Sequence, residues 1–529
     1  MVRAMRTSLA FAALALVACA HPGAPSAPRW TDADILAFVP ADSPYVIGTA
    51  SGQQANQATT RISKRYFERA VHRARENPDR PESHIIAAFL DATGGGSASL
   101  SATARIENAG IAHQAGFAMY GDPVYPIFRI EVANPVALRG VLRKMLAAAG
   151  PEAATKIVEQ QSAGVPYWTF TGDKVGVIAV VHDRDLTVAL LPSDQLAAHA
   201  PRLVADPRPL HSLRDTIDVR ALESKHHLLD AMFVIADTGR AFEQLTKVEK
   251  LGLGSPECHA DLARIAALAP RLVGGYSERD EQHYAIKLAV DLEPGLAHAL
   301  EGLRAPTPAL SKDPVASLQL GVDLDRALAF LQDAAAGLAA RPLTCAPLGE
   351  LNAAIAKAAS DLPANLPPQV HGLRGLSIAV DDLALDPPSG RGELVVLGGQ
   401  IGAVVPELLG KNPLTSMLHL AVGGPPIELP TAMFKLPAAH AALAQDRIAV
   451  AVGGDSAASA VTALKTPVDP NAPLAQVYWN IRWFATHLEQ IGLKNMEEYE
   501  DMTMRLDVRD GALELDVAGA WATSAVTTK

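Results

Sequence analysis

The sequence contains few of the residues and runs that usually identify a protein's chemistry. Only three of its 529 residues are cysteine, 5% are aromatic, and acidic residues outnumber basic ones, so the formal net charge is −11. This acidic balance argues against nucleic-acid binding, which needs a basic surface. Beyond the N-terminus no apolar run reaches the roughly 20 residues that span a bilayer, so we expect the body of the chain to be soluble.

Sequence motifs of common catalytic and cofactor sites are missing as well. The chain has no H-E-x-x-H and no G-x-S-x-G, and the adjacent pair His226 and His227 does not have metal-ligand spacing. Residues 453–456 (GGDS) lie where we expect a strand to pass into a helix, but the lysine of a phosphate-binding loop is missing, so we interpret them as a turn and helix cap. We therefore predict no catalytic residue, no metal and no cofactor, and favour a protein that is not an enzyme.

The first thirty residues carry a targeting pattern. Two arginines, Arg3 and Arg6, precede a short apolar run at residues 9–18, which is the layout of a secretory signal peptide. The run ends in Leu-Val-Ala-Cys at Cys19, which resembles a bacterial lipobox. That resemblance implies cleavage after residue 18 and lipidation of Cys19. The Pro-rich residues 19–30 are then an extended tether.

The residue that follows Cys19 is Ala20 rather than aspartate. In the lipoproteins that the chain resembles, this choice favours the outer membrane, so we expect a lipid-anchored protein of the cell envelope that faces the periplasm. The membrane, contacted through the lipid, is the first expected partner.

Removing Cys19 from the count leaves Cys258 and Cys345. An even pair of cysteines in an oxidising compartment predicts a disulfide. Two unpaired buried thiols are the alternative.

Faint internal repeats indicate a duplicated chain. Segments that begin near residues 45, 128 and 186 resemble segments that lie 271, 266 and 262 residues later. A second repeated motif, D-x-x-R-A, follows a short apolar strand at Asp237 and again at Asp323, and each aspartate suits a helix N-cap. We interpret residues 31–306 and 307–529 as two α+β repeat halves.

The repeating element is a strand or hairpin followed by a helix. Near the C-terminus, apolar residues alternate strictly on either side of Asp510 and Gly511, which is a strong hairpin signal. The predicted fold class is therefore α+β, with duplicated antiparallel sheets and helices packed on one face of each sheet.

A basic stripe follows one side of a predicted helix at residues 61–75. Arg61, Arg65, Arg69 and Arg73 form the stripe and make a candidate anion-binding surface, for example for lipid headgroup phosphates. The alternative is an ordinary solvated helix face.

Residues 38–46 (FVPADSPYV) resemble the opening segment of a group of uncharacterised bacterial cell-envelope lipoproteins, which have a "VPADTPYV"-like sequence soon after the anchor. Ser43 stands where that group usually has threonine. The resemblance implies an envelope location and a domain of unknown function, but no activity.

Three functions are consistent with these observations. The first is a non-enzymatic scaffold or binding protein that contacts another envelope protein. The second is a periplasmic carrier of a lipid or other hydrophobic ligand, which would need a continuous apolar groove. The third is a hydrolase of envelope polymers, which would need a cleft with carboxylates of perturbed pKa.

Overall fold

The protein is mixed α and β, and it divides into two compact units. In the computed structural model, unit 1 comprises residues 1–245 and 271–281, and unit 2 comprises residues 246–270 and 282–529. The structure describes residues 30–50, 67, 71–78, 81–95, 100–122, 125–149, 155–162, 164–205, 208–247, 251–280, 282–309, 314–366, 370–385, 388–411, 418–431, 437–487 and 499–521. These units and the predicted repeat halves divide the chain differently, and the repeat halves remain a prediction.

Unit 1 is built on an antiparallel sheet. Its neighbouring strands pair in the order β9 (Arg271–Arg279), β8 (Met232–Asp237), β1 (Tyr45–Thr49), β2 (Phe117–Gly121), β3 (Pro126–Glu131), β7 (Asp185–Pro192), β6 (Val175–Val181), β5 (Val165–Thr171) and β4 (Ile157–Ser162).

The helices of unit 1 pack against its sheet and form two hydrophobic clusters with it. Helices α2 (Asp32–Ala37), α8 (Leu196–Ala205) and α9 (Val219–Lys225) supply Ile35, Leu203 and Leu222 to a core that also holds Val46 and Phe233 of the sheet. A second cluster lies under α4 (Pro81–Ala92), α5 (Ala102–Asn108) and α6 (Pro135–Ala148). Helix α6 begins with Asn134 as its N-cap and with Pro135 in its first turn, where proline needs no hydrogen-bond donor.

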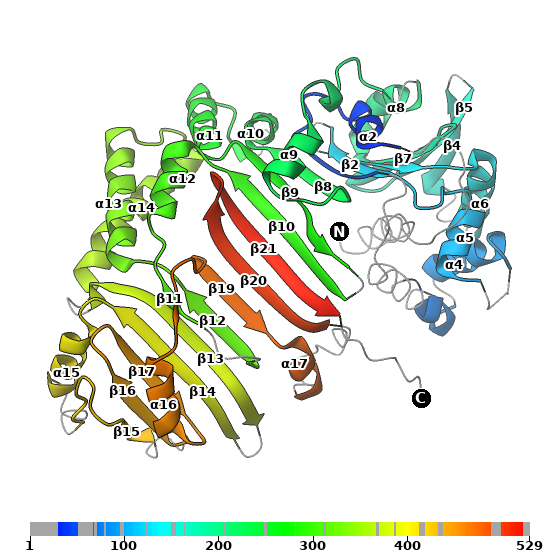
Figure 1. Cartoon of the computed structure of the whole chain (residues 1–529). Helices are drawn as coiled ribbons and strands as arrows, with labels where there is room; N and C mark the ends of the chain where they lie inside the picture. The colour runs from blue at the N-terminus through cyan, green and yellow to red at the C-terminus, as the bar shows by residue number, and fades with distance from the viewer. Residues whose placement is uncertain are drawn as a thin grey trace. The chain divides into compact units, whose positions relative to one another are not determined.

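Unit 2 is built on a broader antiparallel sheet (Figure 1). Its strands run in the order β10 (His283–Asp291), β21 (Ala512–Trp521), β20 (Tyr499–Arg509), β19 (Ala475–Trp479), β12 (Ala316–Leu320), β13 (Leu373–Leu385), β14 (Pro388–Gly398), β17 (Arg447–Val452), β16 (Ala439–Leu443) and β15 (Ile427–Leu429). Two short strands, β11 (Thr307–Pro308) and β18 (Val468–Asp469), form a separate pair.

The predicted C-terminal hairpin is confirmed as β20 and β21, the long red strands of Figure 1. Asp510 and Gly511 form the turn with φ of 50° and 75°, a left-handed conformation that asparagine, aspartate and glycine tolerate best. This hairpin supplies two central strands of the unit 2 sheet.

Helices of unit 2 gather at the ends of its sheet. Helix α15 (Ile401–Lys411) packs Ile401 on one face near β16 and β17, and α16 (Ser456–Leu464) packs Ala460 and Ala463 on the other face. The remaining helices are α11 (Pro256–Leu268), α12 (Pro294–Glu301), α13 (Leu324–Ala340), α14 (Gly349–Asn365) and α17 (Ile481–His487). Because α15 and α16 pack on opposite faces of β16 and β17, the prediction that helices pack on one face of each sheet is wrong for this part of unit 2.

Candidate functional site

Strand pairing in unit 2 aligns apolar side chains into continuous rows across the sheet. The central apolar row crosses seven strands from β10 to β14 and consists of Ile286, Val517, Met504, Val477, Leu318, Ile378 and Leu394. A neighbouring apolar row crosses the same strands two residues away and consists of Leu288, Leu515, Leu506, Ala475, Leu320, Leu376 and Val396. We call these two rows together the apolar face.

None of the side chains of the apolar face is buried. Leu320 on β12 and Ile378 on β13 each retain 36% of their surface exposed to solvent. An antiparallel sheet with one solvated face normally turns its apolar side inward, so an exposed apolar row is unusual. Large exposed apolar patches on a folded protein usually mark a binding surface.

The opposite face of the same strands carries the polar residues, and many of these are buried. Lys287, Gln319, Ser377, Asp507 and Glu514 are all less than 9% exposed. Burial of such groups is unfavourable unless they are paired or hydrogen-bonded. The sheet therefore buries charges on one side, while the residues that the structure describes leave the apolar side only partly covered, with Val396 packed against the cluster that contains Ile401 of α15.

Ion pairs compensate the buried charges. The Lys287 Nζ lies 3.1 Å from a carboxylate oxygen of Glu514. Asp507 accepts from three guanidinium groups, with Arg304 at 2.7 Å, Arg509 at 2.8 Å and Arg505 at 3.3 Å. These contacts join β10, β20, β21 and the segment after α12, and the same face also buries apolar side chains, among them Ala289, Ala379 and Val395.

The dimensions of the apolar face suit a lipid tail. Seven strands at about 4.8 Å spacing make it about 29 Å wide. Along β21, the seven residues from Leu515 to Trp521, which continue past the two rows, extend about 20 Å. One acyl chain occupies half of the roughly 30 Å hydrocarbon thickness of a bilayer, or about 15 Å, and so fits within this area.

Unit 1 carries a shorter row of the same kind. Val234, Ile47, Met119, Phe128 and Val188 align across β8, β1, β2, β3 and β7, and all five are only partly buried. The side chains of the alternate positions on β1 and β2, Val46 and Tyr120 among them, are buried in the helix-covered core.

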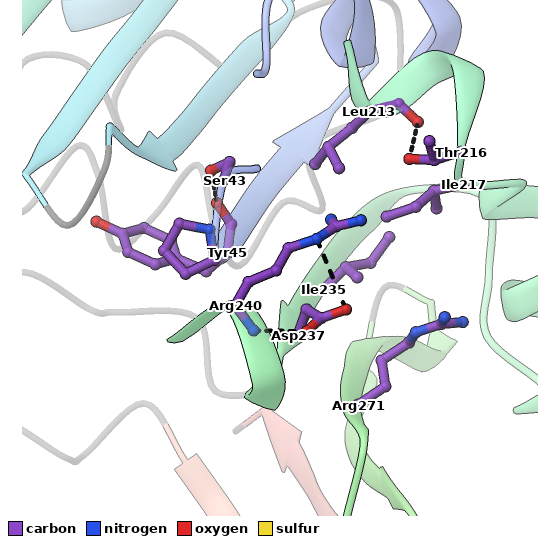
Figure 2. Close-up of a pocket in the computed structure, with 10 residues that line it drawn as sticks. Ser43, Tyr45, Leu213, Thr216, Ile217, Ile235, Asp237, Arg240 and Arg271 are labelled. Atoms are coloured by element: carbon purple, nitrogen blue, oxygen red, sulfur yellow. Dashed lines mark hydrogen bonds and ion pairs between the residues drawn. The ribbon is translucent and has the colours of Figure 1, made fainter. Parts of the chain in front are cut away.

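Unit 1 also contains a small pocket, shown in Figure 2. Arg240 and Arg271 extend toward it, Asp237 lies between them, and the other lining residues are Ser43, Pro44, Tyr45, Leu213, Thr216, Ile217 and Ile235. Its enclosed space is about 30 Å³, which is room for one or two water molecules. The pocket is therefore too small for the ligands that we consider below.

The positions of Asp237 and Arg240 in the pocket follow from helix capping. Asp237 ends β8 and its Oδ1 accepts from the backbone N–H of Arg240 at 2.9 Å, while its other oxygen lies 3.8 Å from Arg240 Nε. Asp323 repeats this arrangement with Arg326 at 3.1 Å and 3.9 Å. The predicted capping role of both aspartates is confirmed.

An acidic cluster lies elsewhere in unit 1. Burial and the charges of Asp32 and Asp230 raise the pKa of Glu223 to about 7, and Arg220 opposes them. The pKa of Asp32 is raised by burial and by Asp230. Glu223 is only 7% exposed, and none of these three carboxyl groups lines the pocket of Figure 2. The cluster is therefore separate from that pocket.

The predicted disulfide is present between Cys258 and Cys345, with sulfur atoms 2.06 Å apart. It joins α11 to the segment that precedes α14. Beside it, Asp261 accepts from the backbone amides of Cys345 at 2.8 Å and of Thr344. Burial opposes ionisation of Asp261, but these amide bonds outweigh it and hold the pKa of its carboxyl below the usual value. The disulfide and the Asp261 carboxylate together hold α11 against the segment that precedes α14.

The other predicted sites have mixed outcomes. Cys19, Arg61, Arg65 and Arg69 lie outside the described residues, whereas Arg73 is exposed on the helical segment at residues 71–76. The anion-binding surface therefore stays a prediction. Residues 453–456 form a turn into α16, with Asp455 as its N-cap, as expected. Among the described helices, none is long and apolar enough to cross a bilayer.

Sequence reasoning did not identify the apolar face. Its signal was visible as the alternation at residues 502–508 and 513–517, which predicted a hairpin with one apolar side. Alternation of this kind does not indicate which side of the sheet the rest of the chain covers. No protein-family description, no curated protein and no solved structure matches the chain.

Proposed function

We propose that the protein is a lipid-anchored lipoprotein of the cell envelope that binds a hydrophobic ligand on the apolar face of unit 2. The observation that carries this proposal is the inverted polarity of the sheet. Of the fourteen aligned apolar side chains, Leu320 and Ile378 are exposed and the others are only partly buried, while lysine, glutamate and aspartate of the same strands are buried. Covering these side chains would gain about 25 cal/mol for each Å² removed from water.

A ligand of low molecular mass explains the face better than a scaffold role alone. The two rows contain no charged or hydrogen-bonding side chain, whereas interfaces between proteins usually have a polar rim and direct hydrogen bonds. Two methionines, Met502 and Met504, lie on this side of β20, and their flexible side chains adapt to ligands of different shape. A partner protein on the same face is the second candidate.

The envelope location is supported by the N-terminal pattern alone. Arg3 and Arg6, the apolar run and Cys19 have the layout of a lipoprotein signal, and Ala20 favours the outer membrane by resemblance. A ligand with acyl chains fits that location, because a protein anchored at a membrane surface has lipids within reach of its tether.

We further infer that the two sheets derive from one ancestral unit. Ile47 of β1 pairs with Val234 and Met119, and Leu318 of β12, 271 residues later, pairs with Val477 and Ile378. The next two strands agree as well. Phe128 of β3 pairs with Val188 of β7, and Leu394 of β14 pairs with Val450 of β17, at the predicted offsets of 266 and 262 residues. Equal strand order and equal register support the duplication.

Equilibrium binding tests the function. Titration of the purified protein with a neutral fluorescent dye, N-phenyl-1-naphthylamine, should give saturable enhancement that long-chain lipids displace. Titration without enhancement, under conditions where thermal melting shows a folded protein, would remove the hydrophobic-ligand proposal. Displacement by protein fractions but by no lipid would instead favour the scaffold role.

A further inference from the structure

An aromatic cluster lies at one end of the apolar side of the unit 2 sheet. Trp521, at the end of β21, has its ring centroid 5.0 Å from that of Tyr284 and 4.8 Å from that of Tyr499, and the two tyrosines make an edge-on contact at 6.2 Å. Gly519 makes room for this packing, because a Cβ there would lie 2.7 Å from the Tyr284 hydroxyl oxygen. We call these three residues the aromatic cluster.

The cluster lies on the same side of the sheet as the apolar rows. Side chains alternate along a strand, so Leu515, Val517, Gly519 and Trp521 of β21 share one side. Tyr284 pairs with Gly519 and is two residues from Ile286 of the central apolar row. A molecule that extends along β21 from the apolar rows therefore meets the aromatic cluster next.

The indole of Trp521 is a buried donor. Trp521 is 9% exposed, and its Nε1 has no hydrogen-bond partner among the described residues. Buried indole N–H groups usually donate to an acceptor, because a buried donor without a hydrogen bond is unfavourable. Tryptophan and tyrosine are also the residues that proteins place where apolar lipid tails meet polar groups.

We propose that the aromatic cluster binds the polar end of an acyl lipid, with Trp521 Nε1–H donating to an ester carbonyl oxygen whose chain extends over the apolar face. This inference rests on the proposed function and names its ligand class. A neutral acceptor fits better than an anion, because the indole has two aromatic neighbours and burying an unpaired charge is costly. An ester meets both needs, since its carbonyl accepts a hydrogen bond and its chain is apolar.

A pair of lipids that differ in one carbonyl oxygen tests the inference. The probes are 1-palmitoyl-lysophosphatidylcholine and its 1-hexadecyl ether analogue, both below their critical micelle concentrations, with binding measured by dye displacement. Wild-type protein should prefer the ester by about fivefold, the usual effect of one hydrogen bond. Trp521→Phe keeps an aromatic ring but removes the donor, so it should bind the ether as before and lose the preference.

Trp479→Phe is the matched control, because Trp479 pairs with Met502 on the same side of the sheet but lies outside the cluster. It should keep the ester preference. Equal binding of both lipids by wild-type protein would overturn the role of Trp521 while leaving the apolar face intact. Absence of binding by either lipid and by the dye would instead remove the proposed function itself. Thermal melting of each variant shows that the comparison is between folded proteins.

Discussion

Ile378 offers the sharpest single-residue test of the apolar face. It lies within the central apolar row, where it pairs with Leu318 on one side and Leu394 on the other, and it is 36% exposed. Complete burial of an isoleucine side chain contributes about 1.5–3 kcal/mol, so a ligand that covers the exposed third gains roughly 0.5–1 kcal/mol. Truncation in Ile378→Ala should therefore weaken binding by about two- to sixfold.

A charge at the same position should have a much larger effect. In Ile378→Glu the ligand would have to desolvate a carboxylate with no cation beside it, which costs several kcal/mol. We expect affinity for the dye and for lipids to fall by about 100-fold or more, since each 1.4 kcal/mol is a factor of ten. The free energy of unfolding should change by only about 1 kcal/mol, because the position is solvated in the free protein.

Leu351→Glu is the control for this experiment. Leu351 lies on α14 and is 44% exposed, so the change adds the same charge at a similarly exposed leucine away from the apolar face. Both variants are titrated with dye and then with lipid, after thermal melting has shown that each is folded. The reasoning is refuted if Ile378→Glu binds as tightly as wild type, or if Leu351→Glu loses as much affinity.

Three further predictions concern the anchor, the disulfide and the acidic cluster. Cys19→Ser should move the protein from the membrane to the soluble periplasmic fraction, and retention on membranes would exclude a lipid anchor at this residue. Replacing both Cys258 and Cys345 by alanine opens a loop with a sequence separation of 87, which should lower the free energy of unfolding by about 4–5 kcal/mol; equal melting with and without reductant would contradict this. The pKa of Glu223 is raised to about 7 in the folded protein, so the folded state holds a proton on this carboxyl more tightly than the unfolded state does. The stability that the protonated carboxyl contributes is therefore present below pH 4.5 and is lost as the pH rises through about 7. Glu223→Gln should accordingly stabilise the protein at pH 8, by about 1–3 kcal/mol in chemical denaturation, and a variant that is less stable than wild type would show that the carboxylate is favourably paired.

Local features of the fold were predictable from the sequence because they depend on neighbouring residues. The turn at Asp510 and Gly511, the N-caps Asp323 and Asn134, and the glycine turn before α16 each follow from the conformations and hydrogen bonds that a few adjacent residues allow. The Cys258–Cys345 pair was predictable for a different reason, since only two cysteines remained after the lipobox residue was set aside.

The candidate site depends on long-range pairing, which alternation within one strand does not reveal. Val477 and Leu318 meet although 159 positions separate them, and each strand alone shows only that one side is apolar. Which side is covered depends on the helices that pack there and on the charge pairs of the other side, such as Lys287 with Glu514, 227 residues apart. The sequence therefore predicted the strands but not which face would stay open.

Native mass spectrometry of the Cys19→Ser protein, purified from a bacterial periplasm and measured before and after organic extraction, tests the central claim most directly. We expect an adduct of defined mass that extraction removes and whose fragments contain acyl chains. The same measurement on Ile378→Glu should show that adduct reduced or missing. A bare chain in the wild-type sample, together with no uptake of added lipid, would contradict the assignment of the apolar face as a lipid-binding surface.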